Sequence, residues 1–177
     1  MNQLLDKTRK QIEQSVPEQF QQPFLSIVTA GKKLMWSDET FHFVEEYVQG
    51  IQGPEDLVPK VATGVVKGIA IIANESKAPP DMEDPFYAAA FPAALVLACD
   101  ALEYVESAKK IPITEDIVSA TTEAGVRDLS QTFGITPEHL KQAYEQAQQS
   151  QRAPQEGMMD RAGAPAPPAA GAPVPEA

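Results

Sequence analysis

The chain has 177 residues, of which 25 are acidic and 14 are basic, so its formal net charge is -11 at pH 7. A surface of this sign repels nucleic-acid phosphates, and the sequence holds no cluster of lysine and arginine with interleaved aromatics to offset it. Composition therefore argues against direct binding of DNA or RNA. It favours high solubility or a basic protein partner instead.

Cys99 is the only cysteine in the chain, so an intrachain disulfide is excluded and nothing indicates an oxidising compartment. The first fifteen residues are polar and mixed in charge, and they lack the apolar core and the small-residue cleavage site of a signal peptide. We therefore expect the protein to be made in the cytoplasm.

Helix signals begin at the start of the chain. Residues 2–15 predict a polar helix, and a second helix is expected from Pro17, at its first position, to about Trp36. Ser37 is predicted to be the N-cap of a third helix that ends near Gly50 or Gly53. The apolar residues of this third helix share one face: Phe41, Val44, Val48 and Ile51.

The helix expected over residues 54–74 is apolar on two faces, with a narrow polar strip between them. A helix of this kind must be covered on both sides, which predicts a buried place in a bundle. Its spacing Gly64-xxx-Gly68 favours close packing against another helix, either within the chain or between subunits. The polar strip consists of Lys60, Thr63, Lys67 and Asn74.

The stretch from Phe86 to Cys99 holds fourteen uncharged residues with Pro92 in the middle. A membrane-spanning helix needs about 20 consecutive apolar residues, so we interpret the stretch as the central helix of the bundle, with Asp84 as its N-cap. Pro92 removes the helical hydrogen bond to the carbonyl of Ala88 and should bend the helix. Insertion into a membrane in an altered state and lining of a pore are the alternatives.

Later in the chain, Thr114 caps a predicted helix that ends at Gly134, and Thr136 opens a last helix. No alternating β-branched run with hairpin turns appears in the sequence. The sequence therefore predicts an all-α fold, a single compact bundle of about six helices over residues 1–150. The composition changes from residue 151, and residues 161–177 are almost entirely Ala, Pro and Gly, which predicts a disordered tail over residues 151–177 acting as a spacer or tether.

Few residues are candidates for chemistry. Glu39 and His42 match the Glu-x-x-His half-site of di-iron bundles, but the second motif that such a site needs is missing. Cys99 has no neighbouring His or Lys to lower its pKa, which favours a buried inert thiol over a nucleophile. Asp100 and Glu103 fit either an acid/base pair or, more simply, the wet side of a helix. We expect no enzyme activity, no metal and no cofactor.

Three residues are the candidate packing or interface positions, namely Gly64, Gly68 and Trp36. Trp36 follows Leu34 and Met35 at a predicted helix end, which favours an anchor in the core. If a partner docks here, an exposed tryptophan is the first residue expected to contribute binding energy.

The order of the segments supports a comparison. A polar N-terminal helix is followed by the small-residue helix GVVKGIAIIANES, the helix FPAALVLACDALEYVE, the ending FGITPEHLKQAYEQAQQ and the Ala/Pro/Gly tail. This organisation resembles small helical structural proteins encoded beside the portal and capsid genes of tailed bacteriophages. The resemblance implies a non-enzymatic protein of the virion or of head assembly, made in the host cytoplasm and located in the virion. Its expected partners are portal- or capsid-associated phage proteins, or copies of itself.

Two other functions stay open. One is a phage protein that is ejected with the DNA and inserts its two apolar helices into the host envelope, which liposome flotation would detect. The other is a soluble helical adaptor or chaperone with no role in a virion. The sequence does not distinguish this adaptor from a virion or head-assembly protein, because the residues on a helix face do not identify the protein that binds there.

Overall fold

A computed structural model describes residues 2–77, 85–136, 138–139, 141–142 and 144–145. Within these residues the chain forms α-helices and no strand, which confirms the predicted all-α fold. The helices are α1 (Gln3–Ser15), α2 (Glu18–Trp36), α3 (Phe41–Gln49), α4 (Pro54–Glu75), α5 (Pro85–Lys109) and α6 (Glu115–Phe133). The predicted cap at Asp84 and the predicted tail of residues 151–177 lie outside the described residues.

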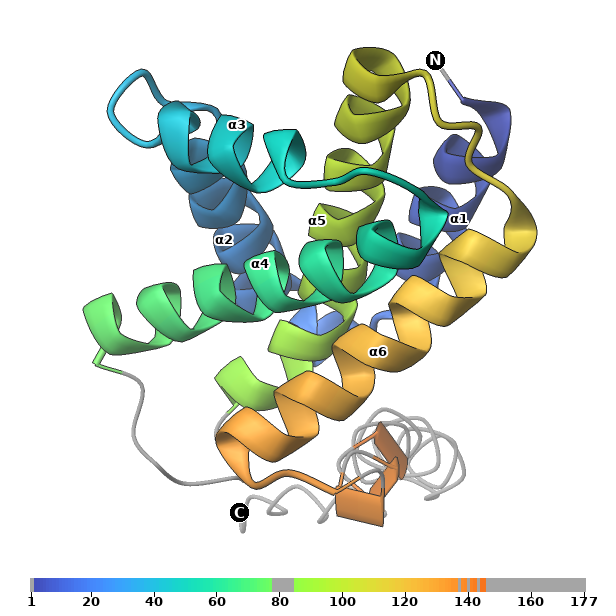
Figure 1. The fold of residues 1–177 in the computed structure, drawn as a ribbon. Helices are drawn as coiled ribbons and strands as arrows, with labels where there is room; N and C mark the ends of the chain where they lie inside the picture. The colour runs from blue at the N-terminus through green and yellow to red at the C-terminus, as the bar shows by residue number, and fades with distance from the viewer. Residues whose placement is uncertain (1, 78–84, 137, 140, 143, 146–177) are drawn as a thin grey trace, which may run out of the picture.

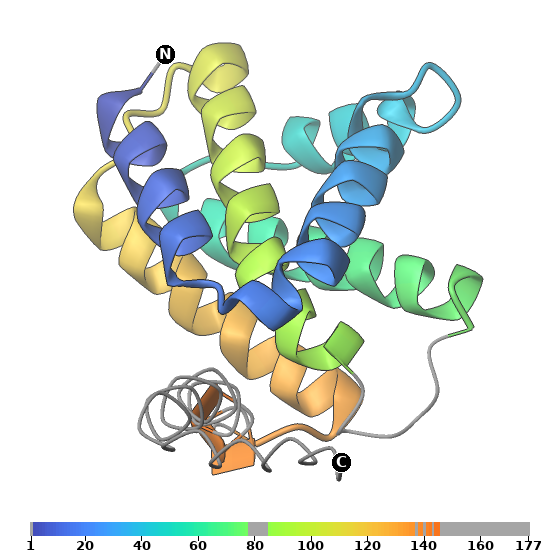
Figure 2. The same cartoon turned by 180° about the vertical axis from the view of Figure 1, so that it is seen from behind.

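Helix α5 occupies the centre of the fold because it is apolar on most sides. Helices α1 and α2 pack along one side of it, and α4 and α6 cross its other side (Figures 1 and 2). Its most deeply buried side chains include those of Ala89, Ala90, Ala93, Val96 and Leu102. The interpretation of this segment as the central helix of the bundle is confirmed.

By length and composition, α5 is also the one helix among the described residues that could cross a membrane. The run of fourteen uncharged residues is shorter than the helix itself, because α5 has 25 residues in total and extends to Lys109. Of its most apolar window, 72% is buried inside the fold. Burial of this kind is what the core helix of a bundle requires.

Helix α4 packs against α6, α5 and α2, so that both of its predicted apolar faces are covered (Figure 1). The buried residues on these two faces are Leu57, Val61, Ala62, Val65, Val66, Ile69 and Ile72. One strip of the helix stays open to solvent, and it holds Lys67 and Ile71. This strip forms one side of the site described below.

The start of α3 differs from the prediction. Ser37 is the C-cap of α2, and its backbone N–H donates to the carbonyl of Lys33 at 3.0 Å. Its hydroxyl shares a hydrogen bond of 2.7 Å with the hydroxyl of Thr40. The prediction of Ser37 as an N-cap is wrong, because its N–H closes α2, a connecting turn of residues 38–40 follows, and α3 begins at Phe41.

Helix α6 has the predicted boundaries. The side chain of Thr114 accepts a hydrogen bond from the backbone N–H of Ile117, at 3.4 Å. Gly134 follows the last turn with φ of 68°, in the left-handed region that favours glycine at a helix end. Beyond it, the backbone N–H of His139 donates to the hydroxyl of Thr136 at 3.4 Å, but the rest of the predicted last helix lies largely outside the described residues.

Candidate functional site

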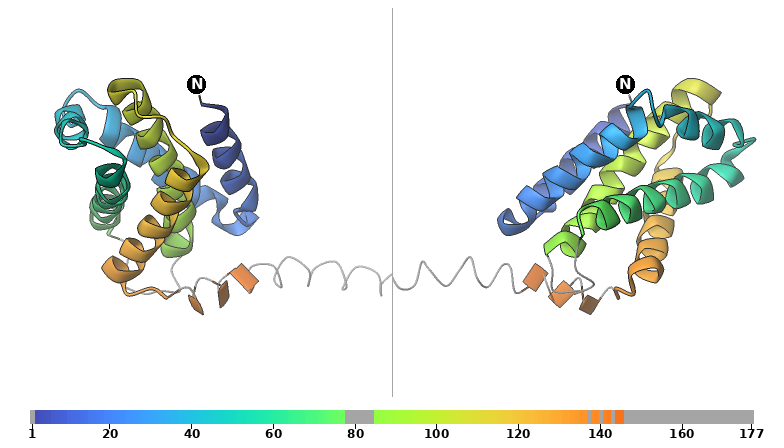
Figure 3. Two further views of the ribbon diagram at one scale, coloured as in Figure 1. Left: turned by 45° about the vertical axis from the view of Figure 1, so that its right-hand side comes forward. Right: turned by 90° about the vertical axis from the view of Figure 1, so that its left-hand side faces the viewer.

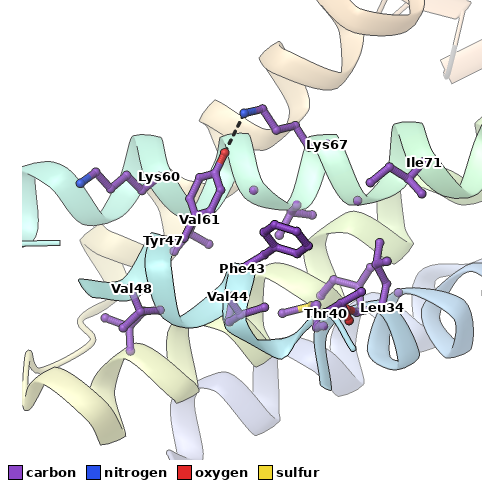
Figure 4. A pocket seen from close by; sticks show the side chains of 18 of the residues that line it. Leu34, Thr40, Phe43, Val44, Tyr47, Val48, Lys60, Val61, Lys67 and Ile71 are labelled. Carbon is purple, nitrogen blue, oxygen red and sulfur yellow. Dashed lines mark hydrogen bonds between the residues drawn. The ribbon is translucent and has the colours of Figure 1, made fainter. Parts of the chain in front are cut away.

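An apolar groove with a volume of about 430 Å³ lies between α3 and α4, and α2 and α5 form its floor (Figure 4). Helices α3 and α4 run alongside each other at one edge of the bundle (Figure 3). Its lining is hydrophobic except for a few side chains, such as that of Thr40. The apolar side chains that line it include Leu34, Met35, Val44, Val48, Val61, Val65 and Leu97.

Large apolar side chains stand exposed on both sides of this groove. On α3, Phe43 is 56% exposed and Tyr47 is 36% exposed. On α4, Ile71 is 45% exposed. Single exposed apolar residues are common, but a contiguous patch with a groove at its centre is typical of an interaction surface. We name this set the groove rim: Phe43, Tyr47 and Ile71.

Two lysines of α4 link it to α3 across the groove. Nζ of Lys67 donates a hydrogen bond of 2.7 Å to the hydroxyl of Tyr47 and lies 5.4 Å from the centre of its ring (Figure 4). Nζ of Lys60 donates to the backbone carbonyl of Gly50. Among the described residues that line the groove, these lysines are the charged ones. The groove therefore combines an apolar lining with a positive edge.

The two glycines singled out in the sequence lie on the α4 side of the groove. A Cβ atom added at Gly64 would lie 3.9 Å from Cδ1 of Tyr47, and one added at Gly68 would lie 3.7 Å from Cδ2 of Leu34. Both distances are ordinary van der Waals contacts. The two glycines thus widen the groove, and a role in a contact between subunits stays a prediction.

The close approach of two helices occurs at another glycine. A Cβ atom added at Gly31 of α2 would lie 2.3 Å from Cδ1 of Leu97 on α5, much closer than any real contact. The absent side chain at Gly31 therefore lets α2 pack tightly on the central helix. No spacing pattern marks this glycine in the sequence, because no second small residue lies four positions away from it.

Trp36 lies at the junction of α2, α3 and α5. Its ring centre is 6.0 Å from that of Phe41 and 5.3 Å from that of Tyr104. It is nevertheless 37% exposed. Trp36 therefore anchors an aromatic cluster beside the groove, and a further role in binding a partner stays a prediction.

The two carboxylates weighed as an acid/base pair belong to an ionic network with α1. Nε of Arg9 lies 2.8 Å from Oδ1 of Asp100, and the same guanidinium donates to Glu103 and, at 3.3 Å, to the carbonyl of Cys99. Burial lowers the pKa of Arg9, but the hydrogen bond to Glu103 and the charge of Asp100 more than offset this, so the pKa lies above its ordinary value. The prediction that Asp100 faces water is wrong, because α1 covers it and leaves its side chain 13% exposed.

The remaining candidates for chemistry have simple environments. Cys99 is 3% exposed, and burial raises the pKa of its thiol to about 11, as an inert buried cysteine requires. Glu39 and His42 are both exposed, and the imidazole of His42 lies 3.9 Å from the ring of Phe43, measured between centres. Among the described residues, no group of three or more His, Cys, Asp and Glu side chains is placed to hold a metal ion.

Fold and site together define an all-α domain with an apolar surface groove. No protein-family model, no curated protein and no solved structure matches this chain. Any statement about function therefore rests on the sequence and on the groove itself.

The rim residues were missed by the sequence analysis, although a signal for them exists. Once the core face of α3 is assigned, Phe43 and Tyr47 are left four residues apart along one border of that face. On α4, Ile71 follows Gly64 and Gly68 at helical spacing, in line with the polar strip. Apolar residues left over after a core face is assigned indicate an interaction surface.

Proposed function

We propose that this chain is a non-enzymatic assembly protein of a bacteriophage virion or head, which docks a structural partner in the apolar groove. One observation carries the docking role. Phe43, Tyr47 and Ile71 stand exposed around an apolar groove whose floor includes the buried core residues Leu97 and Val105. Covering such a patch lowers the free energy by about 25 cal/mol for each Å² of apolar surface that is removed from water, and this favours association.

The bundle supports this role by holding the groove in a fixed shape. Leu97 on the floor of the groove is buried in α5, which is packed on both sides by other helices. A preformed groove loses little conformational entropy when it binds, so more of the contact energy appears as affinity. The phage assignment rests on the resemblance in the order of segments.

Quantitative mass spectrometry of gradient-purified particles from the source culture tests the assignment to a virion. A fixed stoichiometric copy number in mature particles supports a virion component. Presence in immature heads alone supports an assembly factor. Absence from both would refute the phage proposal.

A groove variant tests the docking part of the proposal. Phe43→Asp should lower the copy number in particles, because it places a charge in the apolar rim. The matched control is Leu25→Asp, since Leu25 on α2 is 57% exposed and does not line the groove. Equal incorporation of both variants would refute docking at the groove.

Insertion into the host envelope is the second candidate function, favoured by the length and apolar composition of α5. Because most of α5 is buried, insertion would require the bundle to open. Flotation with anionic vesicles at neutral and acid pH tests this directly. A protein that stays at the bottom of the gradient under both conditions would refute insertion.

A further inference from the structure

We infer that the groove binds one amphipathic helix of a partner protein, with an apolar stripe bordered by acidic residues. The inference rests on the proposed docking function and names the chemistry of the partner. It follows from the shape of the groove, from the extent of the rim and from the sign of the charges along its edge.

The shape of the groove fits a helix lying lengthwise. Its two sides are helices, and Figure 4 shows Phe43 of α3 reaching toward α4 between them. On the α4 side, Gly64 and Gly68 present no side chain of their own to the groove, Tyr47 and Leu34 lie next to them, and Ile71 projects beyond them. The side chains of a bound helix would pack over this strip of small residues as ridges pack into grooves.

The extent of the apolar surface favours a helix over a small ligand. A volume of about 430 Å³ falls within the range of pockets for small molecules. Phe43 of α3 and Ile71 of α4 line this volume, yet 56% of the one and 45% of the other is exposed to solvent. A small molecule inside the groove would contact only the side of each residue that faces the groove, whereas a helix lying over the rim would also cover their outer parts.

The lysines that border the groove favour a partner helix with acidic residues on either side of its apolar stripe. Lys60 and Lys67 border the groove, and no carboxylate is among the described residues that line it, although the chain as a whole carries a charge of -11. Each ammonium group has three N–H donors, one of which is used in the bond to α3. The other donors can meet carboxylates of a partner, and complementary charges of this kind steer association.

The same charges argue against a second copy of the chain as the occupant. In a two-fold symmetric contact the same patch faces itself, so Lys60 and Lys67 of both copies would come together. The repulsion between these lysines opposes self-association through the groove.

Two synthetic fluorescent helical peptides test the inference with the full-length chain. Both carry leucines at the positions i, i+3, i+4 and i+7, one with glutamates and the other with lysines along the borders of the stripe. We expect the acidic peptide to bind at least about tenfold more tightly by fluorescence anisotropy. Added salt should weaken its binding. The double variant Lys60→Glu/Lys67→Glu should reverse the preference.

Further variants separate the groove from other surfaces. Phe43→Asp should abolish binding of the acidic peptide, whereas Leu25→Asp should leave it unchanged. Phe43 is exposed, so the variant should fold, and its melting temperature checks this. Equal affinity for the two peptides, no binding of either, or binding that survives Phe43→Asp would each overturn the inference. Mass spectrometry of particles does not depend on this assay, so the two proposals fail separately.

Discussion

The hydroxyl of Tyr144 donates a hydrogen bond of 3.2 Å to the backbone carbonyl of Ala88. This carbonyl would normally accept from the N–H four residues later, but that residue is Pro92, which has no N–H. The ring of Tyr144 also packs on that of Phe20, with their centres 5.7 Å apart. A residue near the end of the described chain thus completes the hydrogen bonding of the central helix.

Replacement of Tyr144 by Phe should lower the free energy of unfolding by about 1 kcal/mol, the usual net value of one hydrogen bond. The carbonyl of Ala88 would then be buried without a partner. Urea denaturation measures the change. Tyr104→Phe is the matched control, since the hydroxyl of Tyr104 makes no hydrogen bond with a described residue. Equal losses in the two variants would contradict the role given to Tyr144.

Replacement of Arg9 by Met should cost about 2 kcal/mol of stability, because Asp100 would keep only its ion pair with Lys32, at 3.2 Å. Adding Asp100→Asn should recover part of this loss, since the unpaired charge is then removed. A double-mutant cycle by urea denaturation gives the coupling between Arg9 and Asp100. A coupling of zero would show that the network does not hold α1 on α5. Lys141→Met, which removes an exposed ion pair with Glu145, should leave the stability unchanged.

The fold was predictable where local chemistry decides it. Thr114 and Gly134 mark the ends of α6 because capping and a left-handed glycine depend only on near neighbours. The prediction failed at Ser37, whose residue type suits an N-cap of one helix but whose N–H closes the helix before it. Two helices in close succession compete for the same polar residue, and the sequence alone does not decide which of them takes it.

The site was harder to predict because it depends on which helices become neighbours. Asp100 has the sequence pattern of a solvent-facing residue, yet Arg9, 91 positions earlier in the chain, covers and neutralises it. The pair Gly64 and Gly68 has the spacing of a close helix contact, yet the tight contact forms at Gly31. Neither outcome follows from periodicity, since both depend on how α1 and α2 are placed on α5.

Alanine substitutions at two glycines should have opposite effects on stability. Gly31→Ala should destabilise the protein by about 1 to 2 kcal/mol, because Leu97 is buried and must shift to make room for the new methyl group. Gly64→Ala should stabilise it by up to about 1 kcal/mol, since alanine favours the helix and the added Cβ makes ordinary contacts. Thermal and urea unfolding of the two variants check the signs. A loss of stability at Gly64 would show that its side of the groove is already closely packed.

Stability should fall at alkaline pH because of Cys99. Burial raises the pKa of its thiol to about 11, from the ordinary 9.0, so the folded state favours the neutral thiol. Its contribution to stability is therefore complete below about pH 9 and is lost as the pH rises through about 11. The full difference corresponds to about 3 kcal/mol. Urea unfolding at about pH 8 and about pH 11 measures this loss in the native chain and in Cys99→Ala. The difference between the two proteins isolates the contribution of the Cys99 thiol, because the raised pKa of Tyr144 affects both proteins alike. An equal loss of stability in the two proteins would show that the thiol ionises as readily in the folded chain as in the unfolded one.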